Sequence, residues 1–509
     1  MAELRVTIAS HHFVCTRISP RAYSAVERFA KRYAQWGYER KGRRMIYKML
    51  KVFAARSKNR KEYRFHINTL EDFKACMAAD FIKESMIEYV TRPIPSYPHF
   101  DLPIRDGWVP DPKRDQPEAI AYAKKDVHKA SKVLTLKPGG GKSYCSMQIV
   151  HDLGYRPAYV LRPGYIDKWV RDAVKTLDIE PEDVMTVEGS KQLKALLELA
   201  SLDALDAKVI LISNKTIQNW LKLYEHEGAK ILDLGYACLP EDLFEHIKSC
   251  RVVDELHQDF HLNFKIDLYT HTPYSISLSG TLKSDDDFVN KMYEVAYPGS
   301  MRFVPLTVHK FIRATAIMYH LKHPDRIRTT QPGDTRYSHV AFEQSIMKNK
   351  EALKGYVDLI IKCVDGMFMG EYIRGDRMVI YASTVEFCTY LTNQLRSYYY
   401  EFNIGRYVQG DPYSNLMTMD ISVTTLGSAG TNVDIPGLKR VLLTVALNSS
   451  QGNIQGAGRL RELNDGRTPD FAYLVCEDVP KAIDYHRHKL ELLKDEALKC
   501  NIERSGMRI

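Results

Sequence analysis

The stretch KPGGGKS at 137–143 could bind phosphate groups. It lies between the apolar run KVLTL and a helical pattern that starts at Ser143, so its glycines fall in a strand-to-helix turn. Backbone amides in such a turn, with the positive end of the helix dipole, bind anions. Lys142 would reach the β- and γ-phosphates of a nucleotide, and Ser143 would ligate Mg²⁺. The predicted cradle consists of Pro138, Gly139, Gly140 and Gly141. The alternative is a glycine-rich turn that carries a lysine by chance.

An acidic pair in DELH at 254–257 directly follows the apolar run CRVV. At the carboxyl end of a strand, where open α/β sheets bind ligands, Asp254 would hold Mg²⁺ through its hydration shell. Glu255 would orient and deprotonate an attacking water. His257 would couple this pair to Ser279 and Thr281 in SGT. The alternative is a solvated surface pair.

Two arginines near the end of the chain, Arg459 and Arg461 in QGAGRLR, could complete a phosphoryl-transfer site. A planar guanidinium that arrives from a separate domain neutralises charge on the transferred group. The sequence leaves open which arginine acts, and the alternative is a basic surface turn.

A glutamine upstream of the glycine stretch, Gln116, could read the edge of an adenine through a bidentate amide contact. It follows a loop that carries Trp108 and Arg114, and Arg114 is the second nucleotide-binding candidate there. A lone glutamine is weak evidence, so its position before the glycine stretch is the only support.

Strand-like runs alternate with helical patterns from about 116 to 300 and again from about 376, which predicts two parallel-sheet α/β lobes. The helical pattern at 345–368 is assigned to the start of the second lobe. Residues 1–95 predict a compact α+β module, with strands at 5–9 and 13–18 and a helix at 20–36. A hairpin is expected between 43–57 and 63–67. A proline-rich segment at 91–116 predicts a boundary near 95.

Short polar groups follow several predicted strands and could contact successive phosphates of a nucleic-acid strand without reading bases. These candidates are Arg162, Pro163, Ser213, Thr216, Ser383, Thr384, Gly410 and Thr425. Ordinary strand-to-helix turns are the alternative for any one of them.

The basic charge of the chain is concentrated at its start. Residues 1–100 contain 20 Lys and Arg against 9 Asp and Glu, whereas the whole chain has a net charge of only +9. The stretch 28–64 interleaves 14 of these basic residues with aromatic ones. This pattern favours contact with duplex or junction backbones, and a solvated face with core aromatics is the alternative. The candidates are Arg40, Lys41, Arg43 and Arg44.

The composition, 45% hydrophobic and 27% charged residues over 509 positions, is typical of a soluble globular protein. No window reaches the roughly 18 apolar residues of a membrane span, and the start lacks the order of a signal peptide. We therefore expect no membrane partner and a cytoplasmic location, the host cytoplasm if the source is viral. The nine cysteines form no C-x-x-C pair that would indicate zinc.

Taken together, the motifs resemble those of superfamily 2 helicases of the DExH type over roughly 105–475. KPGGGKS, DELH and SGT are similar to the first three family motifs. YASTVEF, TTLGSAGTNVDIP and QGAGRLR are similar to the fourth, fifth and sixth. The small basic N-terminal module and the segment at 337–360 look most like the phage UvsW-like branch-migration helicases.

The resemblance implies two RecA-like lobes in tandem behind a small α+β domain, with ATP and Mg²⁺ as cofactors. The domains would be 1–95, which binds DNA, 96–300, which binds ATP, and 301–509. By the same resemblance, Gly430 and Asp434 would contact ATP and Gln455 would join the arginines in catalysis.

The predicted function is an ATP-dependent DNA helicase or translocase on forked, branched or single-stranded DNA. It would unwind, migrate branches or reverse forks in recombination, repair or replication. Three alternatives stay open. An RNA helicase would differ in 2′-OH contacts that a sequence does not reveal. The others are a duplex translocase subunit of a nuclease or packaging complex, without strand separation, and a non-catalytic module with a decayed ATP site.

Overall fold

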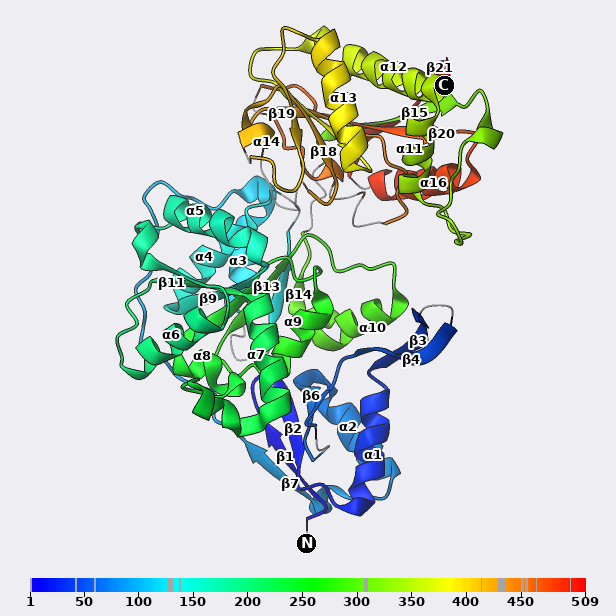
Figure 1. Cartoon of the computed structure of the whole chain (residues 1–509). Helices are drawn as coiled ribbons and strands as arrows, with labels where there is room; N and C mark the ends of the chain where they lie inside the picture. The colour runs from blue at the N-terminus through cyan, green and yellow to red at the C-terminus, as the bar shows by residue number, and fades with distance from the viewer. Residues whose placement is uncertain are drawn as a thin grey trace. The chain divides into compact units, whose positions relative to one another are not determined.

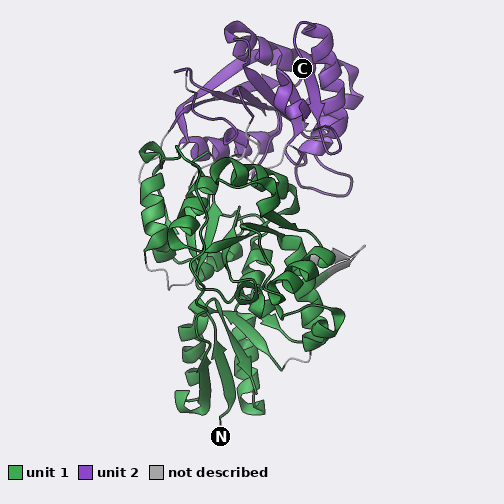
Figure 2. Ribbon diagram, turned by 90° about the vertical axis from the view of Figure 1, so that its left-hand side faces the viewer, with its two compact units in different colours: residues 1–306 green, residues 307–509 purple. Residues whose placement is uncertain are grey.

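The structure, a computed structural model, divides into two compact units, Met1–Leu306 and Thr307–Ile509 (Figure 2). It describes residues 2–41, 44–58, 61–125, 131–136, 139–305, 310–412, 414–428, 435–449, 453, 456–463, 465–494 and 496–509. Five predicted site residues lie outside these ranges, namely Arg43, Pro138, Gly430, Asp434 and Gln455.

The N-terminal part of the first unit contains a five-stranded sheet with the order β5-β6-β2-β1-β7 (Figure 1). Its strands are β1 Leu4–Ile8, β2 His12–Thr16, β5 Ala55–Arg56, β6 Tyr63–His66 and β7 Ile87–Thr91. Two helices pack on it, α1 Pro20–Lys31 and α2 Leu70–Ala79. Ser19 begins α1 by accepting a 3.2 Å hydrogen bond from the Ala22 amide, and Pro20 occupies the first helical position, where its missing amide costs nothing.

A separate two-stranded ribbon consists of β3 Ala34–Lys41 and β4 Arg44–Val52. Two expectations are corrected here. The helix predicted to reach residue 36 ends at Lys31. β4 pairs with β3, and of the segment 43–57 it is β5 that pairs with β6. The segment forms strands because its side chains alternate between two faces. The pairing places Trp36 opposite Met49 and Tyr38 opposite Tyr47.

The first lobe is a seven-stranded parallel sheet with the order β10-β11-β9-β12-β13-β8-β14. Its strands are β8 Lys132–Thr135, β9 Arg156–Leu161, β10 Val184–Val187, β11 Val209–Ser213, β12 Ser249–Val253, β13 Ser275–Ser279 and β14 Arg302–Phe303. Its helices are α3 Gln116–Lys124, α4 Lys142–Leu153, α5 Ile166–Thr176, α6 Ser190–Ser201, α7 Asn214–Glu227, α8 Leu243–His246, α9 Phe260–Asp267 and α10 Asp287–Ala296.

Both faces of this sheet are buried, as expected of parallel strands between helices. Val133 and Val160 belong to one apolar core, and Leu134 and Tyr159, their neighbours in the same strands, belong to another. The first of these cores also contains Phe13 of the N-terminal sheet, so the N-terminal region and the first lobe share one hydrophobic core. The boundary near residue 95 stays a prediction.

The second lobe is another seven-stranded parallel sheet, with the order β17-β18-β16-β19-β20-β15-β21. Its strands are β15 Ile312–His320, β16 Arg377–Ala382, β17 Ile404–Tyr407, β18 Ile421–Thr425, β19 Leu438–Leu443, β20 Asp470–Cys476 and β21 Ala497–Arg508. Its helices include α11 His339–Lys348, α12 Lys350–Met367, α13 Val385–Tyr398, α14 Ser414–Thr418 and α16 Pro480–Lys494. The helical pattern at 345–368 is two helices, because the Asn349 side chain accepts from the amides of Glu351 and Ala352 and caps α12.

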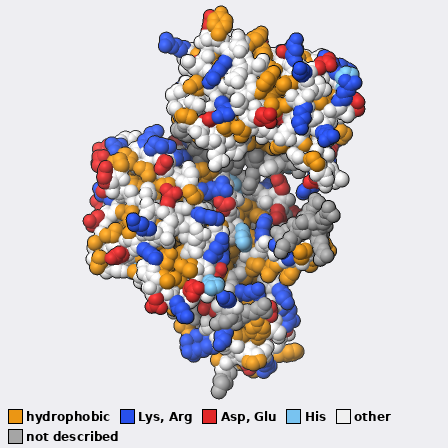
Figure 3. All heavy atoms as spheres, viewed as in Figure 1, with side chains coloured by type: hydrophobic (Ala, Val, Ile, Leu, Met, Phe, Trp, Pro, Cys, Tyr) orange, Lys and Arg blue, Asp and Glu red, His pale blue; other side chains and the backbone are white. Residues whose placement is uncertain are grey.

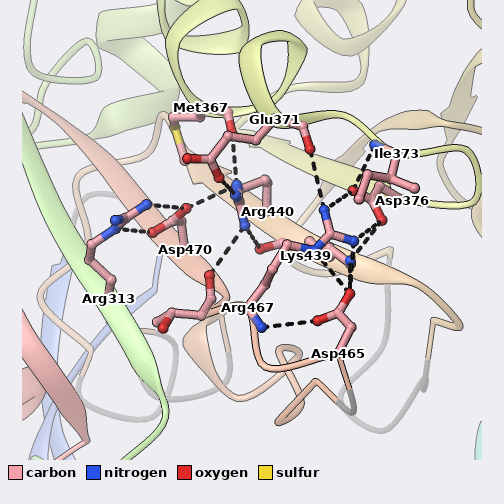
Figure 4. Close-up of polar contacts among 11 residues, drawn as sticks. Arg313, Met367, Glu371, Ile373, Asp376, Lys439, Arg440, Asp465, Arg467 and Asp470 are labelled. Carbon is pink, nitrogen blue, oxygen red and sulfur yellow. Dashed lines mark hydrogen bonds and ion pairs between the residues drawn. The ribbon is translucent and has the colours of Figure 1, made fainter.

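Charged side chains form a paired network at the amino-terminal edge of the second-lobe sheet (Figure 4). Arg440 is bound by Glu371 and Asp470, and Arg467 by Asp376 and Asp465. Arg313 also pairs with Asp470, and Lys439 pairs with Asp376 and Asp465. Four cations thus meet four carboxylates in this network.

The predicted fold class is confirmed, since two RecA-like parallel-sheet α/β lobes follow a small N-terminal α+β sheet. Among the described residues, no helix is both long enough and apolar enough to cross a membrane.

Candidate nucleotide and nucleic-acid sites

The glycine stretch joins β8 to α4 in the first lobe, as the sequence predicts. Gly139 and Gly141 both have a φ of 81°, a left-handed conformation that glycine adopts without strain. A Cβ atom at Gly141 would lie 2.2 Å from the Gln116 Nε2 atom, so this position also lacks room for a side chain. Gly141 precedes the first turn of α4, which contains Lys142 and Ser143. The unpaired amides of that turn suit a phosphate group.

The acidic pair lies beside this loop. Only β13 separates β8 from β12, and Asp254 and Glu255 come directly after β12. Lys142 Nζ donates a 2.8 Å hydrogen bond to Glu255 Oε1, and only 11% of the lysine side chain and 4% of the glutamate side chain are exposed. The fold thus joins the lysine of the glycine stretch to the DELH stretch in a nearly dry site.

Asp254 is held by two donors. Its Oδ2 accepts from the Trp169 indole N–H at 2.8 Å, and its Oδ1 accepts from the Glu255 amide at 2.9 Å. Burial, followed by the neighbouring Glu255 carboxylate, raises the Asp254 pKa above its usual value. Two adjacent buried carboxylates repel each other, and a bound cation or proton relieves that repulsion.

This donor set fits Mg²⁺ bound together with phosphates. The described residues contain no group of three or more His, Cys, Asp and Glu that could hold a metal alone. Mg²⁺ in nucleotide sites needs only one or two protein oxygens, because water and phosphate supply the others. Asp254 and Ser143 would be those ligands, as the sequence predicts.

His257 connects the acidic pair to the SGT stretch. The Ser279 hydroxyl donates to the Thr281 carbonyl at 2.6 Å, so Ser279 Oγ is left to accept from His257 Nδ1, which lies 2.9 Å away. The same Nδ1 lies 3.3 Å from Glu255 Oε2. Burial lowers the His257 pKa, so the imidazole is neutral near pH 7. His257 is thus connected to Thr281 through Ser279, and the coupling role of these residues stays a prediction.

Gln116 and Arg114 contact the backbone of the glycine stretch. Gln116 Nε2 donates to the Gly140 carbonyl at 3.0 Å, and its Oε1 accepts from the Asp111 amide at 2.9 Å. Arg114 Nη1 donates to the Gly139 carbonyl at 3.0 Å. Both side chains therefore hold the backbone of the glycine stretch through hydrogen bonds. The adenine contact of Gln116 stays a prediction.

An aromatic pair beside the loop was not predicted. The Trp108 and Tyr144 rings stack with centroids 5.0 Å apart, and Tyr144 directly follows Ser143. Trp108 is 37% exposed, so the pair offers a flat apolar surface next to the phosphate-binding turn. The signal in the sequence was a tryptophan in the polar loop before Gln116.

Several first-lobe candidates for contact with a nucleic-acid strand already form hydrogen bonds within the protein. Arg162 Nε donates to Asp259 at 2.6 Å, and its Nη1 donates to Gln258 at 2.7 Å. Ser213 and Thr216 are buried, and Thr216 Oγ1 accepts from the Gly189 amide. Pro163 begins a short 3₁₀ helix after β9.

In the second lobe, a buried carboxylate that was not predicted holds the turn after β16. Glu343 of α11 accepts from the amides of Ser383 and Thr384 at 2.9 and 2.7 Å. It also accepts from the Thr384 hydroxyl at 2.6 Å. Burial raises the Glu343 pKa to about 7. A lone glutamate within an amphipathic helix gives no signal of this role.

Gly410 follows β17 with a φ of 96°, and the Thr425 hydroxyl donates to Ser428 Oγ at the end of β18.

The remaining candidates are distributed over both units. Arg459 is buried against Tyr381 in the second lobe, and Arg461 Nη1 donates to the carbonyls of Gly458 and Leu460. Their approach to the phosphate-binding loop stays a prediction. Arg40, Lys41 and Arg44 lie in the β3–β4 ribbon of the first unit.

No protein-family model matches the chain, and no curated protein matches it either. Among solved structures it is similar to S. cerevisiae Dbp5 bound to RNA and ADP BeF3. That match has a TM-score of 0.48 and 12% identity, and covers 76% of this chain and 89% of that chain. It is also similar to Mss116p bound to ssRNA and AMP-PNP, with a TM-score of 0.45, 14% identity and coverage of 75% and 73%. Because both TM-scores are below 0.5, these similarities carry no argument about the function of the chain.

Proposed function

We propose that the chain is an ATP-dependent DNA helicase or translocase that acts on forked or branched DNA. The observation that supports this most is the contact of Lys142 with Glu255 at the carboxyl edge of the first-lobe sheet. A lysine beside a glycine-rich turn and two carboxylates within its reach are the parts that phosphoryl transfer to water requires.

Each residue of the site would have one role. On nucleotide binding, Lys142 would turn from Glu255 to the phosphates, and Glu255 would then take a proton from the attacking water. Mg²⁺, held by Ser143 and Asp254, would neutralise charge on the phosphates. His257 would report the state of Glu255 to Ser279, because it lies within reach of both.

Residues of the second lobe and of the N-terminal region complete the proposal, and three of them, Gln455, Gly430 and Asp434, lie outside the described ranges. Gln455 and either Arg459 or Arg461 would stabilise the transferred phosphoryl group, and Gly430 and Asp434 would contact the nucleotide. The strand-end groups of both lobes would hold the backbone of one DNA strand, and the basic N-terminal region would bind the duplex or junction. Figure 3 shows Lys and Arg side chains on the surface of that region.

Two assays test this function. ATP turnover is measured without nucleic acid and with single-stranded DNA, forked DNA and single-stranded RNA, and strand displacement is followed on fork, junction and blunt duplex substrates. We expect the largest stimulation with forked DNA and displacement on forks and junctions. Stronger stimulation by RNA would overturn the DNA assignment, and translocation without displacement would overturn strand separation.

A further inference from the structure

The β3–β4 ribbon presents an aromatic face to solvent. Trp36, Tyr38 and Tyr47 are 45%, 66% and 59% exposed. The rings of Trp36 and Tyr47 stack 6.0 Å apart, and those of Tyr38 and Tyr47 lie 5.0 Å apart. Within the described residues no other strand pairs with the ribbon. Three large rings held in contact on an exposed ribbon indicate a surface that binds a partner.

The charge of the ribbon identifies the partner as a polyanion. Residues 34–52 contain six Lys and Arg and one acidic residue, Glu39, a net charge of +5. Aromatic rings beside basic groups bind nucleic acid, because every base has a flat face that stacks on a ring and phosphates meet the cations. The rings also continue into a groove of about 520 Å³, where Trp36 and Met49 face Ala30 and Lys31 of α1 and His261 of α9.

The base of the ribbon is fixed to two helices of the first lobe. The Phe53 ring, which follows β4 and is only 2% exposed, contacts the rings of Phe260, Phe264 and Phe288. His261 of α9 lies 2.8 Å from the Val52 carbonyl. Figure 1 shows the ribbon (dark blue) beside α10.

A carboxylate ties the ribbon to α10 specifically. Asp286, which caps α10 by accepting from the Phe288 amide, also accepts from Gln35 Nε2 at 3.2 Å. It lies 3.4 Å from Lys51 Nζ as well. Asp286 therefore caps the start of α10 and contacts both strands of the ribbon at the same time.

These two helices are the ones that follow the nucleotide-site stretches in sequence. DELH at 254–257 runs into α9 at Phe260, and SGT at 279–281 runs into the cap of α10 at Asp286. A movement of His257 would be passed to α9, and a movement of Ser279 to α10, along short segments. Because both helices pack on Phe53 at the base of the ribbon, either movement would displace the ribbon.

We propose that the β3–β4 ribbon is the element that separates the strands, with Trp36, Tyr38 and Tyr47 stacking on the bases at the fork. This inference rests on the proposed function. Stacking on the rings replaces the neighbour that a base loses when its pair opens, so the face favours the open fork over the closed one.

The test compares three variants of the full chain. The triple variant W36A/Y38A/Y47A removes the rings, W36F/Y38F/Y47F keeps aromatic rings without their polar groups, and Y398A/Y400A removes two exposed rings in the second lobe, 56% and 83% exposed. Each is measured for single-strand-stimulated ATP turnover, for fork unwinding and for the fluorescence of 2-aminopurine at the first base pair of the fork. Thermal unfolding confirms that each variant folds.

We expect the alanine variant to lose fork unwinding by about tenfold or more, the effect of removing one or more base stacks, with a much smaller change in ATP turnover. Its 2-aminopurine signal would no longer be quenched on binding. The phenylalanine variant and the control would unwind like wild type. The variant Q35A/K51M, which removes the ribbon partners of Asp286 and leaves the α10 cap, would lower unwinding per ATP.

Three results would overturn the inference in distinguishable ways. Unchanged unwinding by the alanine variant would exclude the ribbon as the separating element. A parallel loss of unwinding and ATP turnover would make the ribbon a loading surface instead. Wild-type ATP turnover that no nucleic acid stimulates would remove the proposed function itself, and the ribbon's role with it.

Discussion

Two groups of charges, one buried and one partly exposed, lie at opposite kinds of sheet edge and are balanced differently. At the carboxyl edge of the first-lobe sheet, the buried carboxylates Asp254 and Glu255 are neighbours, and Lys142 forms an ion pair with Glu255. At the amino edge of the second-lobe sheet, every carboxylate of the network in Figure 4 has at least one cationic partner within 3 Å. In the first group the neighbouring carboxylate helps to raise the Asp254 pKa, whereas in the second each carboxylate is paired with a cation.

The difference separates a binding site from a structural feature. A buried ion network with its partners in place gains nothing from a ligand, and removing one member leaves an unpaired charge. A buried pair of carboxylates with a raised pKa is under electrostatic strain that a cation or a proton relieves. A buried pair of neighbouring carboxylates at the ligand-binding edge of a parallel sheet is therefore our candidate for the functional site.

The substitution Glu255→Gln should have the largest effect on activity. It keeps the shape of the side chain and removes the base, so ATP turnover should fall by about 10²- to 10⁴-fold. The free energy of unfolding should not fall, because the change also removes one of two neighbouring buried carboxylates. Turnover and denaturant unfolding are measured on the same preparation. Wild-type turnover would show that Glu255 is not the base.

The substitution Asp470→Ala should have the opposite signature. Asp470 is buried and binds both Arg313 and Arg440, so its loss leaves the buried Arg440 guanidinium with only the more exposed Glu371 among its carboxylate partners in the network and should cost about 3 kcal/mol of unfolding free energy. Asp465→Ala is the matched control, because the Asp465 side chain is 44% exposed and should cost less than about 1 kcal/mol. Urea unfolding measures both. Equal losses of unfolding free energy in the two variants would contradict the expectation that a buried ion pair contributes more to stability than an exposed one.

Lys489 of α16 is a third kind of buried charge, since no carboxylate among the described residues pairs with it. Its ammonium lies over the Tyr473 ring at 4.4 Å, and burial lowers its pKa to about 7. The folded chain thus binds fewer protons than the unfolded chain between about pH 7 and 10.5, so wild-type stability should rise across this window. Lys489→Met should be more stable than wild type at pH 6, and this advantage should shrink toward pH 10.5. Lys494→Met, at an exposed position of the same helix, should show no such trend in thermal unfolding.

The site of the first lobe could be predicted from sequence because its parts are local. An apolar run followed by glycines or by an acidic pair indicates a strand end, and β8, β12 and β13 end where the motifs begin. The contact of Lys142 with Glu255 needs the strand order β8-β13-β12 as well. Local patterns do not contain that order, so the distance between the two residues had to come from the structure.

The second lobe shows where sequence patterns are insufficient. β15 was not predicted, although it lies inside the sheet, because the partners that bury it, β20 and β21, come from the far end of the chain. β21 was also missed, since it is an edge strand rich in exposed polar residues. The charge network has the same origin, because its members are scattered from Arg313 to Asp470 and meet only when the strand ends come together.

The substitution Ser279→Ala should have the smallest effect on activity of these changes and the most selective one. It removes the Oγ atom that joins His257 to Thr281 and leaves Asp254, Glu255 and Lys142 in place. One buried hydrogen bond is worth about 0.5 to 1.5 kcal/mol, so strand displacement per ATP should fall by roughly two- to tenfold while turnover changes less. Ser277→Ala is the control, because Ser277 is equally buried in β13 and contacts Tyr297 instead of the nucleotide site. It should cost similar stability and leave displacement per ATP unchanged. If both variants lower displacement equally, the effect comes from the packing of β13 and the path from His257 to the ribbon is excluded.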